Sequence, residues 1–69
     1  MPLALADMGV PMMIQRVGGN PAMRQHLADL GFVPGSEVTV ISTLGGNMIV
    51  SVKECRIAIS NETAMKIMV

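Results

Sequence analysis

The spacing of apolar and polar residues changes several times along the chain, and each change marks the start of a new predicted element. Residues 1–9 form an apolar lead-in that ends at Gly9. Within residues 12–17 the apolar positions suit one short strand, although their alternation with polar residues is imperfect. The pair Gly18-Gly19 ends this strand. We therefore expect a lead-in, one short strand and a turn before the first helix.

A helix of roughly three turns is predicted for residues 21–30. Asn20 suits the N-cap because its side chain can accept a backbone N–H, and Pro21 gives up a donor that has no partner at a helix start. Apolar residues then recur at helical spacing, at Met23, Leu27 and Leu30. We expect this stripe to be buried. Gly31 follows at the C′ position, where a left-handed backbone is needed.

Beyond the helix the apolar period shortens to that of β-strands. The sequence Val33-Pro34-Gly35-Ser36 predicts a type II turn, because proline presets the first central position and glycine supplies the positive φ of the second. Ser60 is expected to cap a single helical turn that runs through Thr63. Four strands are predicted here: one that begins at Val38, two over residues 48–52 and 56–59, and a last one at residues 67–69. Turns are predicted at Gly45-Gly46-Asn47 and at Lys53-Glu54-Cys55.

About five short strands and one helix, joined by such short connections, favour a small closed or nearly closed antiparallel barrel. We therefore expect a mainly β fold with one inserted α-helix at about residues 21–30. Residues 1–69 are expected to form a single domain.

Composition restricts how this domain is stabilised. The chain has 69 residues and 51% hydrophobic content, and a domain of this size buries only about 60% of the surface of its unfolded chain. The single cysteine, Cys55, excludes an internal disulfide and a cysteine-rich zinc site. Eight methionines and one aromatic residue, Phe32, predict a core of Met, Val, Ile and Leu.

Charge and hydropathy limit the classes of partner. Five basic and five acidic residues give a formal net charge of zero, and no basic patch stands out, so we expect no nucleic-acid partner. No apolar stretch is long enough to span a bilayer, and the N-terminus has no basic region and is interrupted by Asp7. A cytoplasmic protein that does not insert directly into the membrane is expected, and an unpaired cysteine fits a reducing compartment.

The residues offer little for catalysis. The glycines match neither nucleotide-binding spacing, G-x-G-x-x-G or G-x-x-x-x-G-K-[ST]. A nucleophilic triad would need His26, which falls in the middle of the predicted helix, together with Cys55 or a serine and an orienting acid. We therefore predict a non-enzymatic protein without a cofactor.

Metal binding is the more interesting alternative. His26 and Asp29 are three residues apart and share a helix face, and Cys55 is a third weak candidate ligand. Ferrous iron and zinc usually require more histidine or thiolate ligands than one chain offers here. A tight site would therefore be shared between the chains of a homo-oligomer. The chain has no Tyr or Trp for a proline-rich peptide groove, whereas addition of a partner strand to a sheet edge stays open.

The segment from Arg24 to Gly35 resembles the FeoA family, small cytoplasmic accessory proteins of bacterial ferrous iron uptake. The family reads, loosely, Arg-x-x-Leu-x-x-Leu-Gly-apolar-x-Pro-Gly. The matching residues are Arg24, Leu27, Leu30, Gly31, Phe32, Pro34 and Gly35. The resemblance continues to the ending Ala64-x-x-Ile67-x-Val69 and covers essentially residues 3–69. Glu54 departs from the family, which often has glycine there, and this puts the type of that turn in doubt.

The resemblance implies an SH3-like barrel and a protein that binds or regulates FeoB, a membrane ferrous iron transporter with a cytoplasmic GTP-binding domain. The inserted helix would distinguish this module from a generic barrel, so its exposed side is the expected partner surface. The candidate partner-binding residues are Arg24, Gln25, His26 and Phe32, with a place as the only ring of the core as the alternative for Phe32. Two alternatives stay open: a transition-metal-binding sensor or carrier that acts as an oligomer, and a stand-alone relative of the C-terminal domain of iron-dependent repressors.

Overall fold

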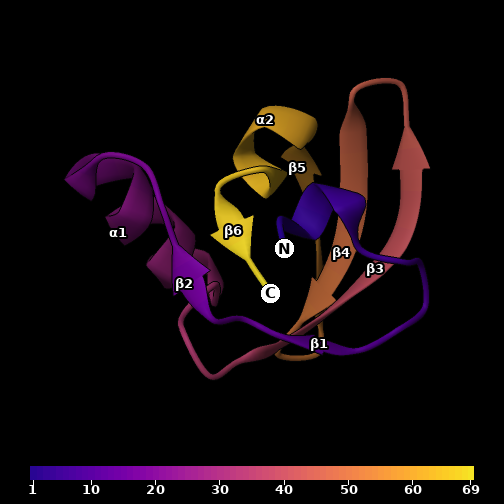
Figure 1. Cartoon of the computed structure of the whole chain (residues 1–69), viewed down its shortest axis with the longest axis horizontal. Helices are drawn as coiled ribbons and strands as arrows, with labels where there is room; N and C mark the ends of the chain where they lie inside the picture. Colours follow the sequence, from indigo (N-terminus) through magenta and orange to yellow (C-terminus); the bar gives the residue numbers. More distant parts are fainter.

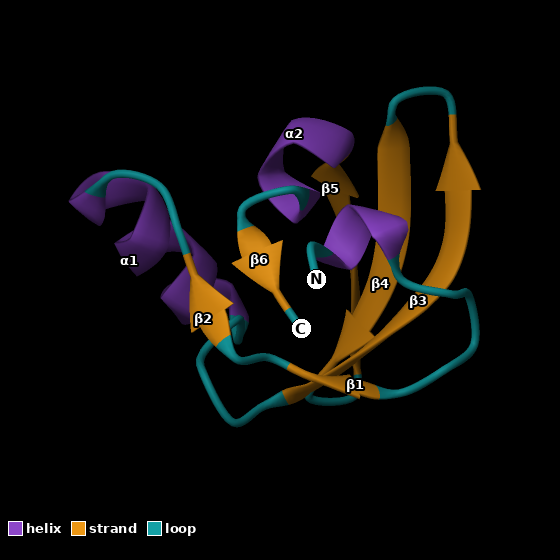
Figure 2. Ribbon diagram, in the orientation of Figure 1, coloured by secondary structure: helices purple, strands orange, loops and turns teal.

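The computed structural model describes residues 1–69 and contains two small antiparallel sheets around one core (Figures 1 and 2). The four-stranded sheet has the order β1-β3-β4-β5, and β2 pairs with β6 in the second sheet. The strands are β1 (Met12–Met13), β2 (Arg16–Val17), β3 (Glu37–Leu44), β4 (Asn47–Val52), β5 (Cys55–Ser60) and β6 (Ile67–Met68). The helices are η1 (Leu3–Leu5), α1 (Pro21–Leu30) and α2 (Asn61–Ala64). The predicted small, mainly β fold with one inserted helix is confirmed.

The single strand expected within residues 12–17 is wrong, because the chain crosses from one sheet to the other there. Met12 is opposite Val38 in the large sheet, whereas Arg16 is opposite Met68 in the small one. Between them Ile14 is buried, and its backbone N–H donates to Ser36 O over 2.8 Å. The imperfect alternation in this segment reflects the crossing, and the strand count rises to six.

The helix α1 begins and ends as predicted. The Asn20 Oδ1 atom accepts the backbone N–H of Met23 over 2.7 Å, and Gly31 has the left-handed φ of 109°. Of the expected buried stripe, only Leu27 is fully buried, while Met23 and Leu30 are half-buried. All three residues nevertheless contact the core, and Leu27 in the middle of the stripe is the most deeply buried.

Both tight hairpins have two-residue turns with left-handed backbone. Gly45 and Gly46 have φ values of 51° and 67°, the geometry that glycine favours and that matches strand twist. Lys53 and Glu54 have φ values of 50° and 66° without being glycine. Cys55 was expected in this turn, but it lies in β5 opposite Val52. Two-residue loops match the twist of the flanking strands, so the turn ends at Glu54 and Cys55 begins the next strand.

The N-terminal lead-in, residues 1–9, is part of the folded domain. Leu3 is fully buried, and Pro2 forms a bridge with Met68. The backbone N–H of Val69 donates to Met1 O over 2.7 Å, so the first and last residues lie side by side. Farther along, Met8 forms a parallel bridge with Val40 of β3.

The C-terminal segment follows the prediction closely. The Ser60 Oγ atom accepts the backbone N–H of Thr63 over 3.1 Å and caps the short helix α2. The last strand, β6, ends at Met68, one residue before the predicted end.

One continuous core fills the space between the two sheets, and it contains no buried polar residue. Four valines from β3 and β4 alternate into it, and Phe32 supplies its only ring. The members are Leu3, Ile14, Leu27, Phe32, Val38, Val40, Met48, Val50, Val52, Ile59, Ala64 and Ile67.

Gly35 provides a test of the turn that leads into β3. Its φ is 90°, and a Cβ added there would meet no atom within 4 Å, so a substitution causes backbone strain rather than a clash. We expect Gly35→Val to lower the free energy of unfolding by about 1–3 kcal/mol, as measured by urea or thermal denaturation. Gly35→Asn should lose less, because asparagine tolerates positive φ better. A valine variant that melts like the wild type would contradict the turn assignment.

Candidate functional site

The exposed side of α1 carries four polar side chains and is the predicted partner surface. Arg24, Gln25, His26 and Asp29 are all exposed, and we call this set the exposed α1 face. Gln25 Nε2 donates to Asp29 Oδ1 over 3.0 Å, one helical turn away. The opposite side of the helix directs Leu27 into the core. Three of the predicted partner-binding residues therefore share one solvated surface.

Arg24 is the motif residue that the fold uses least. Leu27 and Phe32 are buried, Gly31 caps the helix, and Pro34-Gly35 form the turn into β3. The Arg24 side chain is exposed and makes neither a hydrogen bond nor an ion pair with another side chain. Its charge is available to a partner.

Phe32 does not belong to this surface. Its side chain is 1% exposed, so the surface-anchor role is wrong and the alternative, that Phe32 is the only ring of the core, is confirmed. The left-handed residue Gly31 reverses the chain at the end of α1, and the Phe32 N–H donates to Leu27 O over 2.9 Å. This reversal turns the ring inward, as is usual for a large apolar side chain in a small core.

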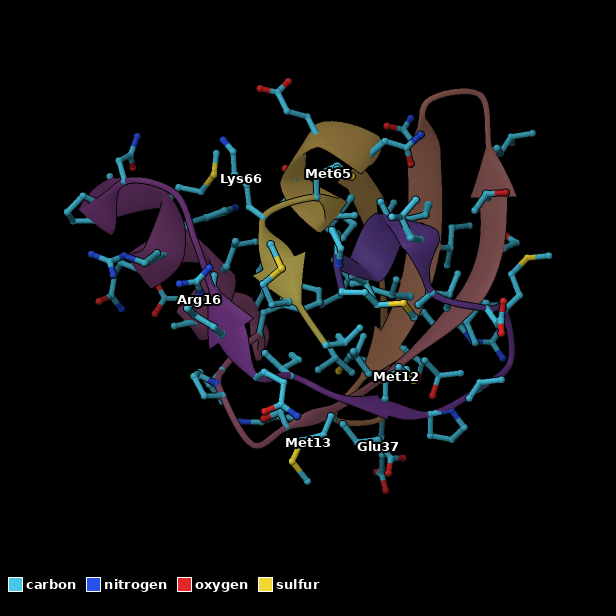
Figure 3. All side chains as sticks on the ribbon, in the orientation of Figure 1. Met12, Met13, Arg16, Glu37, Met65 and Lys66 are labelled. Carbon is cyan, nitrogen blue, oxygen red and sulfur yellow. The ribbon has the colours of Figure 1, made fainter.

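Positive charge extends beyond α1 onto the neighbouring ribbon of β2 and β6. Lys66 Nζ lies 3.5 Å from Met23 Sδ, so the Lys66 side chain rests against the first turn of α1. Its backbone O accepts the N–H of Gly18 over 2.7 Å, which ties the end of β2 to the start of β6. Arg16 on β2 lies on the same side of the molecule as Lys66 (Figure 3). Three of the five basic residues thus lie on α1 or on the elements beside it.

The candidate metal ligands are not brought together. His26 and Asp29 lie on α1, whereas Cys55 begins β5, and Asp29 accepts its hydrogen bond from Gln25 rather than from His26. No group of three or more His, Cys, Asp and Glu side chains in the chain could hold a metal ion. The residues of one chain therefore do not fit an iron or zinc centre.

A shallow polar depression lies on the outer side of the large sheet, and sequence reasoning did not identify it. Its volume is about 380 Å³, and it includes the cross-strand neighbours Thr39 and Ser51. Only the register of β3 against β4 brings these hydroxyls together. The lining residues are Ser36, Glu37, Thr39, Ser51, Lys53 and Glu54. The depression contains no histidine or cysteine, and no hydrogen bond joins one of its hydroxyls to Lys53 or to a carboxylate.

The chain is similar to known proteins along its whole length. The FeoA domain family matches residues 1–69. An Fe(2+) transport protein A of Methanocaldococcus jannaschii is 37% identical over 68 residues, which span 99% of this chain and 83% of that protein.

Solved structures share the fold. The Stenotrophomonas maltophilia FeoA, an SH3 domain protein in complex with zinc, superimposes with a TM-score of 0.86 at 26% identity, over 99% of this chain and 87% of that one. A manganese-dependent transcriptional repressor gives a TM-score of 0.86 at 18% identity, over 97% of this chain and 39% of the repressor. The likeness to the repressor concerns the fold alone. The SH3-like architecture is confirmed.

The scattered ligands generate a prediction about metal binding. We expect anaerobic titration calorimetry of Fe(II) into dilute protein to show no tight stoichiometric binding, because one chain offers too few ligands. His26→Ala should leave this result unchanged and should shift the melting temperature by no more than a few degrees, because the side chain is exposed. Tight one-to-one binding that His26→Ala abolishes would contradict the prediction.

Proposed function

Because the chain belongs to the FeoA domain family, we propose that it is a non-enzymatic accessory protein of ferrous iron transport that binds the cytoplasmic part of an FeoB transporter. The observation that carries this proposal is the match over the whole described chain, residues 1–69. The related Stenotrophomonas maltophilia protein is described as a candidate activating factor of ferrous iron transport, which supports the same role. The fold by itself would not specify a function.

A binding role suits the chemistry of this chain better than a catalytic one. The exposed α1 face offers charges and amides for contact with a protein, and the core contains no buried polar group that could act as an acid or base. In the polar depression on the large sheet, no hydroxyl is hydrogen-bonded to a side chain that could act as its base. The protein therefore acts through its surface.

The exposed α1 face, extended by Arg16 and Lys66, is the proposed transporter-binding surface. Its outer side chains are free because the fold uses only the opposite side of the helix. Positive charge at Arg24 and Lys66 suits an acidic patch on the partner, since complementary charge raises association rates and fixes orientation. The depression beside Lys53 borders the end of α1, because a Cβ at Gly31 would lie 3.5 Å from Lys53 Cδ.

The proposed location is the cytoplasmic side of the membrane, where the transporter's GTP-binding domain lies. Among the helices of the structure, none is sufficiently long and apolar to cross a membrane.

Direct metal binding by an oligomer is the second candidate function. The zinc complex of the Stenotrophomonas maltophilia FeoA favours it, because that relative matches 99% of this chain. In such an oligomer, a second chain would supply the further metal ligands that one chain, with His26, Asp29 and Cys55, does not provide. Titration calorimetry of Fe(II) or zinc at millimolar protein, compared with the same titration at micromolar protein, tests this function: tight binding only at the higher concentration would support it.

Charge reversal at Arg24 tests the proposed surface. We expect Arg24→Glu to weaken binding to the FeoB cytoplasmic domain on the order of tenfold, which corresponds to about 1.4 kcal/mol, as measured by biolayer interferometry. The melting temperature should fall by no more than a few degrees, because Arg24 is exposed and unpaired.

Arg56→Glu is the matched control, since Arg56 is also exposed and the substitution makes the same change in charge on β5. It should weaken binding much less than Arg24→Glu. Equal binding by the wild type and Arg24→Glu, with a loss on Arg56→Glu, would move the interface from the helix to the edge of the large sheet.

A further inference from the structure

Strand β5 is the longest edge strand of the two sheets. It ends the order β1-β3-β4-β5, and its six residues pair only with β4 (Figures 1 and 2). None of the backbone hydrogen bonds outside the regular elements involves residues 55–60, and no isolated bridge joins the strand. The other edge strands, β1, β2 and β6, have two residues each, and the last three residues of β3, 42–44, pair only with β4. A row of unpaired backbone groups on a strand of this length can template another strand.

The hydrogen-bond pattern shows which groups of β5 are free. The two-residue turn Lys53-Glu54 makes Val52 and Cys55 a hydrogen-bonded pair, and bonded pairs then alternate along antiparallel strands. At the other end of β5, Asn61 N donates to Gly46 O over 2.9 Å, as the same alternation of bonded pairs requires. Ile57 therefore bonds to β4, and the N–H and C=O groups of Arg56 and Ala58 point away from it. Both of these residues are exposed.

The edge lacks the features that normally prevent pairing. The strand contains no proline, and its six residues keep an unbroken register with β4. Arg56 is its only charged residue. Natural edge strands usually carry proline, a bulge, several charges or a covering element. The irregularity that this sheet does have lies between Val40 and Ser42 of β3, inside the sheet.

We propose that β5 pairs with β5 of a second copy of this chain, antiparallel, across a two-fold axis at Ile57. In this register Arg56 of each copy is opposite Ala58 of the other, and the two residues exchange backbone hydrogen bonds at both ends of the pair. All free N–H and C=O groups of Arg56 and Ala58 are then satisfied. The two large sheets join into one continuous sheet of eight strands, from the four in each copy.

The sequence of β5 favours its own copy as the occupant in this one register. Centring the pair on Arg56 would place two arginines opposite each other, which is destabilising. Centring it on Ala58 would pair Arg56 with Ser60, whose C=O group accepts the first hydrogen bond of α2. Centring on Ile57 avoids both problems and places two half-buried isoleucine side chains together.

The self-pairing should be weak, because only two exposed residues of each copy donate and accept across the edge. Sedimentation velocity of the full chain from micromolar to millimolar concentration should show a concentration-dependent monomer–dimer equilibrium. Ala58→Pro removes an outward N–H without removing a bond to β4, and we expect it to weaken dimerisation at least tenfold. Ala58→Val keeps the N–H and should dimerise like the wild type.

A cross-link tests the register even if the proline variant folds poorly. In a Cys55→Ser background, Ile57→Cys should form an intermolecular disulfide when an oxidant such as diamide is added, because directly opposite residues in a non-hydrogen-bonded pair are close enough. Ala58→Cys is the matched control and should cross-link far less, since the two copies of residue 58 are offset along the strands.

A chain that stays monomeric at millimolar concentration, or a dimer that forms equally well with Ala58→Pro, would overturn the proposal. Pairing of β5 with a strand of the transporter instead of a second copy would also overturn it, and would appear as loss of transporter binding by Ala58→Pro without any wild-type dimer.

Discussion

The left-handed backbone at Gly31 and Gly35 is the constraint on which the rest of the structure depends. Gly31 ends α1 and sends Phe32 into the core, and Gly35 completes the turn that starts β3. The same corner holds the crossing between the two sheets, because the Gly35 N–H donates to Ile14 O and the Ile14 N–H donates to Ser36 O, each over 2.8 Å. The helix end, the core ring and the start of β3 therefore follow one another closely beside the crossing at Ile14, which explains why this stretch contains two glycines and a proline.

This arrangement separates the residues that make the fold from those available for binding. Most residues of the family motif form the end of α1 and the turn into β3. The motif therefore identifies the architecture rather than the chemistry of the exposed α1 face. Arg24 is the exception, since it is part of the motif and has no structural partner. The exposed α1 face lies on the capped helix that ends at Gly31, and the core beneath it contains no buried polar residue.

The sequence predicted those elements whose signals are local. The cap residues Asn20 and Gly31 placed α1 correctly, and Ser60 placed α2, because capping chemistry acts within a few residues. The split of residues 12–17 and the burial of Leu3 depend on contacts with distant segments, which periodicity cannot show. The inward turn of Phe32 follows from the chain reversal at Gly31 and lies outside any periodic pattern. The surface was predicted only in part: Arg24, Gln25 and His26 do share an exposed face, whereas the polar depression exists only through the register of β3 with β4.

The central claim is that this chain uses the exposed α1 face to bind the cytoplasmic part of an FeoB transporter. Nuclear magnetic resonance of isotopically labelled protein, recorded with and without the unlabelled transporter domain, tests it most directly because every backbone amide reports separately. The account predicts shifts or line broadening concentrated at Arg24, Gln25, His26 and Asp29, with extension to Lys66. Changes confined to β5, or an unchanged spectrum at saturating concentrations of the transporter domain, would contradict it.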